Sequence, residues 1–459
     1  MEYRTEIDSL GAVEILNDRL YGAQTARSLT YFSIGNELMP FEVIEAYAYI
    51  KKAAAATNTE LNLLSLEKSE AIARAADKIL NRDLDAEFPL HVWQTGSGTQ
   101  TNMNVNEVIA NYANVMLGYK LGEKHPVHPN DDVNLCQSSN DTFPTAMHIA
   151  SFKAIQEKLI PNLANFSATL QTKSNEFSSI IKMGRTHLMD ALPITLGQEF
   201  SGYHQQAVSL ITHITCCLDE LSELALGATA VGTGLNAHPD FSTKAILKIS
   251  DLTQLPFRGA KNKFSAIASH DTLVSVHSVL KNIAVTLVKI ANDIRWMASG
   301  PRCGLAEIIL PENEPGSSIM PGKVNPTQCE AMTMVAAQVL GNDTAVSFAG
   351  SQGNFELNTY KPVIIFNVLQ SIRLLSDAIH NFTEYALKGL KPNIKQLEKY
   401  TQNSLMLVTA LSLHIGYDKS AEIAKHAYKN NLSLRDAALS LGYVTKQEYQ
   451  QWVIPSKMV

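Results

Sequence analysis

Cysteines, blocks of basic residues and long apolar runs are all scarce in this sequence. Its five cysteines form no CxxC pair and are odd in number, so neither a disulfide framework nor a cysteine-based metal site is expected. No apolar stretch approaches the roughly eighteen uninterrupted residues of a membrane span, and we expect no such span. The first residues, MEYRTEIDSLGAVEI, lack the apolar run of a signal peptide and the Arg/Ser bias of a transit peptide. We therefore expect a cytoplasmic protein with reduced thiols.

Motifs for nucleic acids, nucleotides and metals are missing as well. The formal charge is −6 and no basic block occurs, so a nucleic-acid interface is not expected, and an anionic ligand would need a locally positive site. PGKV lacks the spacing of a phosphate loop, and GATAVGTGLN (227–236) follows a helix rather than a strand, which favours a glycine turn. His125 and His128 have no further ligand in metal-binding spacing. We expect no metal ion and no organic cofactor.

Long helices dominate the predicted structure, with strand signals only in AVEIL near the start and in AEIIL at 306–310. The clearest helix lies in 268–300, where apolar residues recur with a period of about 3.5 residues, the seam of a helix nearly parallel to its neighbours. The seam residues are Leu273, Val276, Leu280, Ile283, Leu287, Ile290, Ile294 and Met297. Its other flank is also apolar, which predicts burial on several sides, as in a bundle core shared between subunits.

Three consecutive domains follow from this pattern. Residues 1–137 form an α-rich N-terminal domain, 138–390 a central domain of long helices, and 391–459 a small helical C-terminal domain. Within them we expect a helix over 51–80 that breaks near Asn62–Ser65. Further helices are expected at 150–180, 199–226, 327–341, 358–388, 420–430 and 433–442.

Polar breaks fall before several predicted helices. They are QTGSGTQTNMN (94–104), QSSNDTFPTAMH, GRTHLMDALPITLGQEF and GSSIMPGKVNP (316–326). In the last segment we expect Asn325 to be the N-cap and Pro326 the first helical residue. Hydroxyls and amides at helix N-termini favour an anion. Two interpretations stay open: ordinary well-capped loops, or one site for a small oxygen-rich anion if the segments meet in space.

The same segments carry a resemblance to a known family. GSSIMPGKVNP resembles the signature of the fumarase/aspartase superfamily, and the likeness continues through YGAQTARS, HPNDDVN, GNFELN and HIGYDKSAEIA over essentially the whole chain. Within the superfamily the sequence is most similar to class II fumarate hydratases of the fumarase C type. The resemblance implies a mainly α fold with a long central bundle and two smaller flanking domains. It also implies a homotetramer with a core of about 20 helices and active sites shared by three subunits.

The implied reaction is the reversible, stereospecific hydration of fumarate to (S)-malate in the tricarboxylic acid cycle, through an aci-carboxylate carbanion. The resemblance implies Ser317 as the base, His187 as the group that handles the C2 hydroxyl or the attacking water, and Glu330 as its orienting carboxylate. The implied substrate-binding residues are Ser97, Gly98, Thr99, Asn104, Ser138, Ser139, Asn140, Thr186, Ser318, Lys323, Val324 and Asn325. A second anion site is implied at His128, Pro129, Asn130 and Asp131, where His125 stands in place of the usual arginine.

Two rival functions remain at this stage. Aspartate ammonia-lyases usually have a glutamine where this chain has His187, and PAKVNP where it has PGKVNP, which favours the hydratase. Imidazoles titrate near neutral pH and can serve both directions of a hydration. A structural protein that reuses the scaffold, as lens crystallins do, would need none of Ser317, Lys323, His187 and Glu330. We also expect the 316–326 segment to close as a hinged lid.

Overall fold

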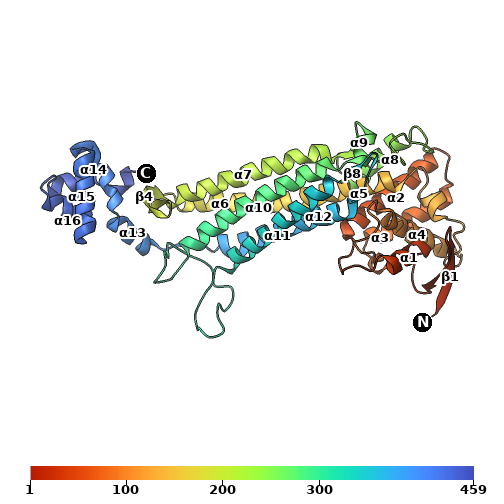
Figure 1. The fold of residues 1–459 in the computed structure, drawn as a ribbon, viewed down its shortest axis with the longest axis horizontal. Helices are drawn as coiled ribbons and strands as arrows, with labels where there is room; N and C mark the ends of the chain where they lie inside the picture. The colour runs from red at the N-terminus through yellow and green to blue at the C-terminus, as the bar shows by residue number, and fades with distance from the viewer. Residues whose placement is uncertain (1) are drawn as a thin grey trace. The chain divides into compact units, whose positions relative to one another are not determined.

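Two compact units make up the structure. The computed structural model describes residues 2–459 and consists mainly of helices (Figure 1), which confirms the predicted fold class. The first unit contains the chain up to Pro161, Thr212–Ala284 and Ala337–Ser376. The second unit contains Asn162–Ile211, Val285–Ala336 and Asp377–Val459. The three consecutive domains expected from the sequence stay a prediction.

Helices account for most of the chain up to residue 297. The N-terminal helices are α1 Ala23–Tyr31, α2 Phe41–Glu60, α3 Leu66–Leu80, α4 Thr99–Met116 and α5 Ser139–Ala154. The following helices are α6 Ile160–Glu176, α7 Leu196–Leu221, α8 Phe241–Thr253, α9 Lys263–Ala268 and α10 Asp271–Met297.

Two long helices and a set of short ones complete the chain. The long helices are α11 Thr327–Gly350 and α12 Lys361–Phe382. The short ones are α13 Ile394–Asn403, α14 Thr409–Ile415, α15 Tyr417–Asn430, α16 Leu434–Ser440 and α17 Lys446–Trp452. Of these, α14 to α17 pack around a small core of their own, which includes Leu411, Ile423 and Ala437.

Strands form five two-stranded sheets within the described residues. They are β1 Tyr3–Asp8 with β2 Gly11–Leu16, β3 Ile181–Thr186 with β4 Met189–Thr195, β5 Glu223–Leu224 with β6 Arg258–Gly259, β7 Ile308–Ile309 with β10 Lys391–Pro392, and β8 Gly353–Asn354 with β9 Leu357–Asn358. The two expected strand signals are confirmed as β2 and β7. The β3–β4 hairpin was not predicted, because its sequence IKMGRTHLMDALPIT alternates only weakly.

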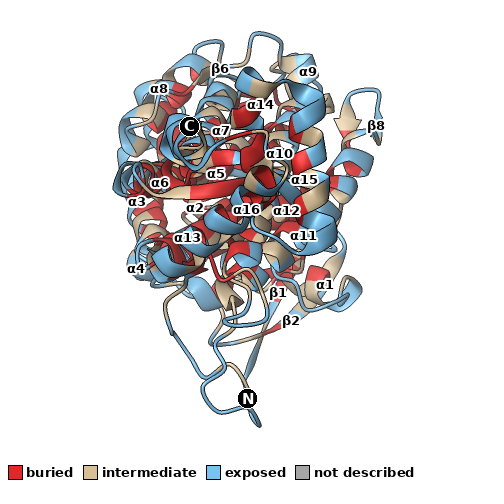
Figure 2. Ribbon diagram, turned by 90° about the vertical axis from the view of Figure 1, so that its left-hand side faces the viewer, coloured by how far each residue is buried: buried red, intermediate tan, exposed pale blue. Residues whose placement is uncertain are grey.

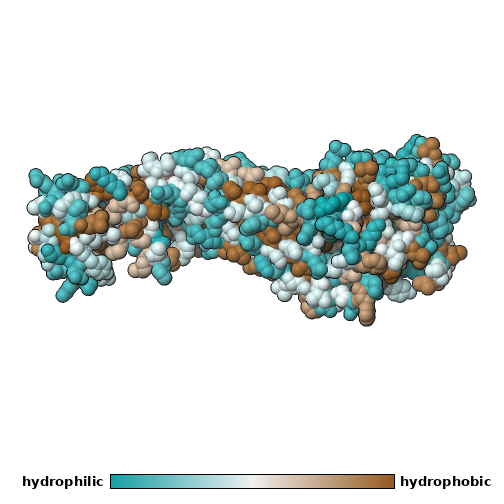
Figure 3. Space-filling view, turned by 90° about the horizontal axis from the view of Figure 1, so that it is seen from above, coloured by the Kyte–Doolittle hydropathy of each residue, from teal (hydrophilic) through white to brown (hydrophobic). Residues whose placement is uncertain are grey.

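Helix α10 confirms the predicted seam. All eight seam residues are buried, and the red segments of the long helices in Figure 2 mark such buried stripes. The other flank is only partly covered: Ala284 and Ala291 are buried, whereas Val285 is 54% exposed. Hydrophobic residues also gather on the outer surface of the long helices, seen as brown patches in Figure 3. The single chain therefore leaves part of the apolar flank of α10 uncovered.

Two helical segments are long and apolar enough to cross a membrane, by length and composition alone. They are Asp271–Met297 and Lys361–Leu387. Many of their residues pack inside the protein, and the core helix of a bundle has the same length and composition.

The break between α2 and α3 agrees with the prediction near Asn62–Ser65. α2 ends at Glu60, and Ser65 caps α3 by accepting a hydrogen bond from Lys68 N at 3.4 Å. The predicted helix over 199–226 begins earlier, at Leu196. A capping box of Thr195 and Gln198 precedes it, with hydrogen bonds of 2.9 and 3.0 Å between side chains and backbone N–H groups.

Candidate functional site

The N-terminus of α5 carries three of the predicted substrate-binding residues. Ser138 caps the helix, accepting a hydrogen bond from Asn140 N at 3.2 Å, and Asp141 closes a capping box by accepting one from Ser138 N at 2.9 Å. Ser138, Ser139 and Asn140 are half-buried. The first turn of α5 thus presents the small polar side chains of Ser139 and Asn140 at the positive end of the helix dipole, which favours an anion.

Asp141 ties this helix start to the glycine turn 227–236. Its second carboxylate oxygen accepts hydrogen bonds from Gly227 N and Thr229 N, both at 2.9 Å, and Asn140 Nδ2 donates to Ala230 O at 2.8 Å. The glycine turn expected from the sequence is therefore present, and it clamps the helix start. Asp141 is fully buried, which raises its pKa to about 6 against the lowering effect of these N–H groups.

The N-terminus of α4 lies beside that of α5. Gly98 precedes α4 with φ +79°, a conformation that favours glycine, and a Cβ there would sit 2.0 Å from the Phe143 ring. Ser97 Oγ lies 2.9 Å from Thr99 Oγ1, and Asn102 Nδ2 donates to Ser139 Oγ at 3.0 Å. The first unit therefore brings the polar segments 94–104 and 137–141 together.

A buried lysine supports the two helix starts. Lys51 of α2 donates to Asn102 Oδ1, Asn134 Oδ1 and Gln137 Oε1 at 2.8, 3.0 and 2.9 Å. Burial lowers its pKa to about 7, although the charge of Asp141 acts in the opposite direction. Asn104, in contrast, is buried and donates to Glu87 O at 2.9 Å, so its amide serves packing within this chain.

The predicted second anion site forms a helical turn at Pro129–Val133. His128 Nδ1 accepts hydrogen bonds from Asn130 N and Asp131 N at 3.2 and 3.1 Å, so the neutral ring carries its proton on Nε2. A cavity of about 340 Å³ borders Asn130 and Asp131 and extends to Gln137 and Thr229. His125 makes an edge-to-face contact with Tyr119, with ring centroids 5.4 Å apart.

The 316–326 segment is an exposed loop with tied ends. Gly316 N donates to Lys323 O at 2.8 Å, and Asn325 Nδ2 donates to Gly316 O at 2.5 Å. Ser318, Lys323 and Val324 are exposed. A Cβ on Gly316 would lie 2.2 Å from Lys323 O, so this closure requires glycine.

Ser317 accepts hydrogen bonds from two backbone N–H groups inside this loop. Ile319 N and Met320 N lie 3.2 and 3.0 Å from its Oγ. Such donors stabilise negative charge on an oxygen, as the base role implied by the resemblance would require. Lys323 contributes a cation from the same loop.

The expected N-cap of α11 is wrong by one residue. The first α-helical hydrogen bond runs from Glu330 N to Pro326 O at 3.2 Å, and α11 begins at Thr327. The Asn325 side chain closes the loop instead of capping the helix, because its amide bonds Gly316 O. Glu330 lies in the first turn and is exposed.

Thr186 and His187 lie at the tip of the β3–β4 hairpin, and not directly before a helix as expected. His187 and Leu188 have φ of +57° and +61°, values that non-glycine residues rarely adopt. Thr186 and His187 are exposed. The unusual backbone of the tip leaves His187 exposed, and such backbone conformations are common at functional positions.

A buried ion cluster anchors this hairpin. Glu307 is fully buried, and its carboxylate lies 3.0 Å from Lys182 Nζ and 2.8 Å from Arg185 Nη1. Lys182 Nζ also lies 2.5 Å from Glu199 Oε2 on α7. Lys182 and Arg185 belong to β3, so the cluster fixes the strand that ends at Thr186.

The predicted site residues therefore form two sets. The first unit contains the predicted site residues at and near the starts of α4 and α5 and in the turn at His128. The second unit holds Thr186, His187 and the residues from Ser317 to Glu330. Within residues 2–459, no group of three or more His, Cys, Asp or Glu side chains could hold a metal ion.

Several buried charged groups were missed from the sequence, among them Asp141 and Lys361. Asp141 could have been found, since Ser138-x-x-Asp141 before a helix is a capping-box pattern. Lys361 begins α12 and is fully buried, and its only sequence signal is a lysine directly before the apolar run PVII. Periodicity alone gives no reason to bury that charge.

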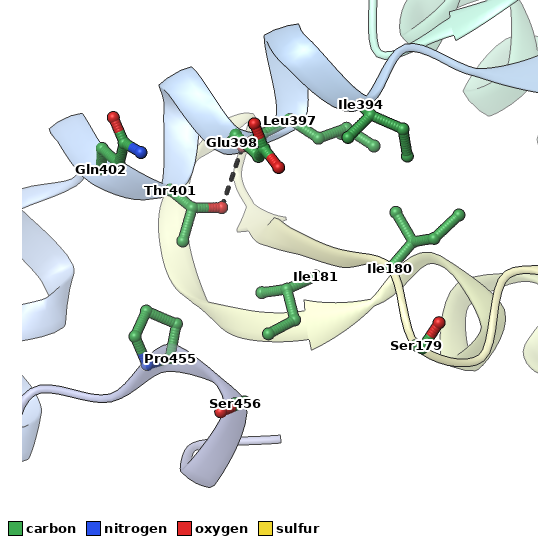
Figure 4. Close-up of a pocket in the computed structure, with 10 residues that line it drawn as sticks. All are labelled: Ser179, Ile180, Ile181, Ile394, Leu397, Glu398, Thr401, Gln402, Pro455 and Ser456. Atoms are coloured by element: carbon green, nitrogen blue, oxygen red, sulfur yellow. Dashed lines mark hydrogen bonds between the residues drawn. The ribbon is translucent and has the colours of Figure 1, made fainter.

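A cavity of about 420 Å³ lies in the second unit, away from all predicted site residues (Figure 4). It lies between β3, α13 and the C-terminal turn. Ile180, Ile394 and Leu397 contribute apolar surface, and Thr401 Oγ1 donates to Leu397 O at 2.9 Å. Its polar groups do not converge on one point, so it has no evident ligand.

Known proteins match the chain over nearly its full length. A family model described as lyase matches residues 11–341, and one described as fumarase C C-terminus matches residues 407–459. Fumarate hydratase class II from Thermosynechococcus vestitus is 59% identical over 450 residues, which cover 98% of this chain and 96% of that protein. Fumarate hydratase class II from Helicobacter pylori is 55% identical over 459 residues, covering 100% and 99%.

Solved structures agree in fold. The crystal structure of recombinant class II fumarase from Schistosoma mansoni matches with a TM-score of 0.97 and 42% identity, covering 100% of this chain and 99% of that chain. A fumarate lyase:delta crystallin from Brucella melitensis, crystallised with bound cobalt, matches with a TM-score of 0.94 and 39% identity, covering 100% and 99%. The chain therefore belongs to the class II fumarate hydratase family of lyases.

Proposed function

We propose that this protein is a carbon–oxygen lyase that reversibly hydrates fumarate to (S)-malate, a reaction of the tricarboxylic acid cycle. The observation that carries the proposal is the 59% identity with a class II fumarate hydratase over 98% of the chain. The presence of His187 and of PGKVNP, which distinguish the hydratase from the aspartate ammonia-lyase pattern, supports the same choice.

The chemistry requires a base that removes a weakly acidic proton next to a carboxylate. In this proposal Ser317 is that base in the dehydration direction, and the intermediate is an aci-carboxylate carbanion. Support comes from the Ser317 oxygen, which accepts hydrogen bonds from Ile319 N and Met320 N and shares its loop with the Lys323 cation. Closure of the 316–326 lid would exclude water and strengthen these interactions.

His187 handles the C2 hydroxyl or the attacking water, and Glu330 orients the imidazole. The two substrate carboxylates bind to small donors at helix starts and loops, where backbone N–H groups favour anions. These are Ser97, Gly98, Thr99, Asn104, Ser138, Ser139, Asn140, Thr186, Ser318, Lys323, Val324 and Asn325. His128, Pro129, Asn130 and Asp131 form a second anion site in the same proposal.

A homotetramer with active sites shared by three subunits completes the proposal. Support comes from the uncovered apolar flank of α10 at Val285 and from Met334 and Phe348 of α11, which are 68% and 60% exposed. Thr186, His187, Lys323 and Glu330 are also exposed in the single chain. Neighbouring subunits would cover these groups and exclude water from them. We place the enzyme in the cytoplasm.

Incubation with fumarate tests the function directly. The ultraviolet absorbance of the conjugated double bond should fall without any ammonium, and (S)-malate should form. Loss of absorbance only when ammonium is present would identify an ammonia-lyase instead. No loss under either condition would favour a structural protein.

The base is tested by Ser317→Ala. We expect turnover to fall at least about 10³-fold, within the range for loss of a catalytic proton acceptor, with an unchanged thermal unfolding midpoint because Ser317 lies in an exposed loop. Ser351→Ala, at a loop serine outside the proposed site, is the matched control and should retain full activity. Undiminished turnover in Ser317→Ala would remove this residue from the base role.

A further inference from the structure

Lys361 is a buried lysine whose ammonium has no hydrogen-bond partner among residues 2–459. The residue is 0% exposed. Lys51, which is equally buried, donates to three amide oxygens. Because an unpaired buried charge is strongly unfavourable, a lysine kept in this position calls for a functional explanation.

The backbone places Lys361 against the loop that precedes α4. Lys361 N donates to Gly96 O at 3.1 Å, and a Cβ on Gly96 would lie only 1.5 Å from Thr359 O. Gly96 is followed directly by Ser97, Gly98 and the first residue of α4. Any other residue at position 96 would push the start of α12 away from this loop.

Electrostatics connect Lys361 to the start of α5. The charge of Asp141 raises the pKa of Lys361, although burial is the larger effect and lowers it to about 7. The charge of Lys361 in turn helps to hold the pKa of His270 well below its usual range, after the larger effect of burial. Lys361 thus lies at the junction of the α4 loop, Asp141 and the start of α10.

Positive charge exceeds negative charge at this junction. Three lysines, Lys51, Lys263 and Lys361, interact electrostatically with Asp141. The charge of this one carboxylate raises the pKa of each of them. Both Asp141 oxygens already accept backbone N–H groups. Lys263 Nζ donates to Ser242 Oγ at 2.8 Å, whereas the ammonium of Lys361 has no hydrogen-bond partner among the described residues. Its charge is therefore available to attract an anionic ligand.

We propose that Lys361 is a positioning residue that keeps a buried positive charge behind the N-termini of α4 and α5, so that they bind one carboxylate of a small dicarboxylate dianion. This inference rests on the proposed function. In a low-dielectric interior a single charge acts over several ångströms, and it adds to the positive ends of the dipoles of both helices. The bound carboxylate compensates a charge that the empty protein leaves unpaired.

Three substitutions test the role of the charge. Lys361→Met removes the charge and keeps an unbranched chain of similar length, and Lys361→Arg keeps the charge. Lys388→Met removes an exposed lysine that pairs with Glu384 four residues earlier, and it controls for the loss of one positive charge. The measurements are kcat and KM for fumarate and the Kd of succinate, a dicarboxylate with no double bond, in the intact protein.

For Lys361→Met we expect KM and the succinate Kd to rise about tenfold or more, with kcat within about threefold of the starting protein because no reacting atom is touched. Lys361→Arg should restore most of the binding, and Lys388→Met should change nothing. Unchanged succinate binding in Lys361→Met, or an equal loss in Lys361→Arg, overturns the inference. Should Lys361→Met fail to fold, Lys361→Gln takes its place with the same expected losses.

The two proposals fail in different ways. If the unsubstituted protein neither converts fumarate nor binds succinate, the proposed function is wrong and the inference falls with it. If the unsubstituted protein does both and the neutral variants bind succinate equally well, the inference alone is wrong.

Discussion

The two units each contain a buried charge cluster, and the clusters are built differently. In the second unit, Lys182 and Arg185 face Glu199 and Glu307, and three ion pairs of 2.5 to 3.0 Å join them. In the first unit, three lysines act on Asp141, and this carboxylate is held by backbone N–H groups.

This difference separates a structural cluster from one that can serve a ligand. A balanced cluster neutralises itself, so its charges fix neighbouring elements, here the β3–β4 hairpin and α7. A cluster with more amines than carboxylates keeps positive potential that an anion can use. Balance of charge, more than burial, therefore indicates which buried groups serve stability.

Neutralising the balanced cluster should have the largest effect on stability. In Glu307→Gln, Lys182 and Arg185 lose their shared carboxylate inside the protein, and we expect a loss of about 3–5 kcal/mol in the free energy of unfolding. Chemical denaturation at neutral pH measures it. Glu157→Gln, at an exposed pair with Lys153, is the control and should leave the unfolding midpoint unchanged. A loss as small as that of the control would show that the cluster does not anchor the hairpin.

Asp141→Asn should have an intermediate effect. The amide keeps one acceptor oxygen and turns an NH₂ group toward backbone N–H donors, which leaves at least one buried donor unpaired. We expect a loss of about 2–3 kcal/mol in stability and weaker succinate binding, because the start of α5 and the glycine turn separate. Full stability combined with normal binding would contradict this role of the carboxylate.

Lys361→Met should have the smallest effect on stability, and of the opposite sign. Burial lowers the pKa of Lys361 from 10.5 to about 7, so between these pH values the unfolded chain binds more protons than the folded one. The stability of the unsubstituted protein therefore rises with pH across this window, and the penalty is fully present below about pH 7. Lys361→Met lacks the penalty, and we expect it to be more stable by about 2 kcal/mol at pH 7 or below.

That gain should disappear toward pH 10, which thermal unfolding of both proteins from pH 6 to 10 would reveal. Burial also lowers the pKa of Lys51 to about 7 and depresses that of Lys263, but both titrate in the two proteins and cancel in the difference. A difference in midpoint that stays constant with pH would show that Lys361 is not a buried, titrating amine.

Periodicity and capping patterns made the helical framework predictable. The seam from Leu273 to Met297 is buried as expected, and Ser138 caps α5. The β3–β4 hairpin escaped prediction because its strands alternate weakly, and Asn325 was misplaced because its amide had a tertiary partner in Gly316. Such partners depend on contacts between distant segments, which spacing along the sequence does not encode.

The candidate site was predictable only through resemblance. Ser317, His187 and Glu330 stay predictions, because in the proposed tetramer their roles depend on how loops from different subunits meet. Lys361 had no pattern to identify it, since its significance comes from burial against Gly96, far away in sequence. Three-dimensional packing therefore revealed a buried charged group that none of the sequence motifs contains.

The tied ends of the loop around Ser317 have a practical consequence for protein engineering. Gly316 and Lys323 are joined through their backbones, and Asn325 adds a second link, so the residues at the apex lie outside this closed base. Ile319 and Met320 are 84% and 49% exposed. A fluorescent reporter introduced at the apex would test whether the segment moves on ligand binding, while the junction at Gly316 stays intact.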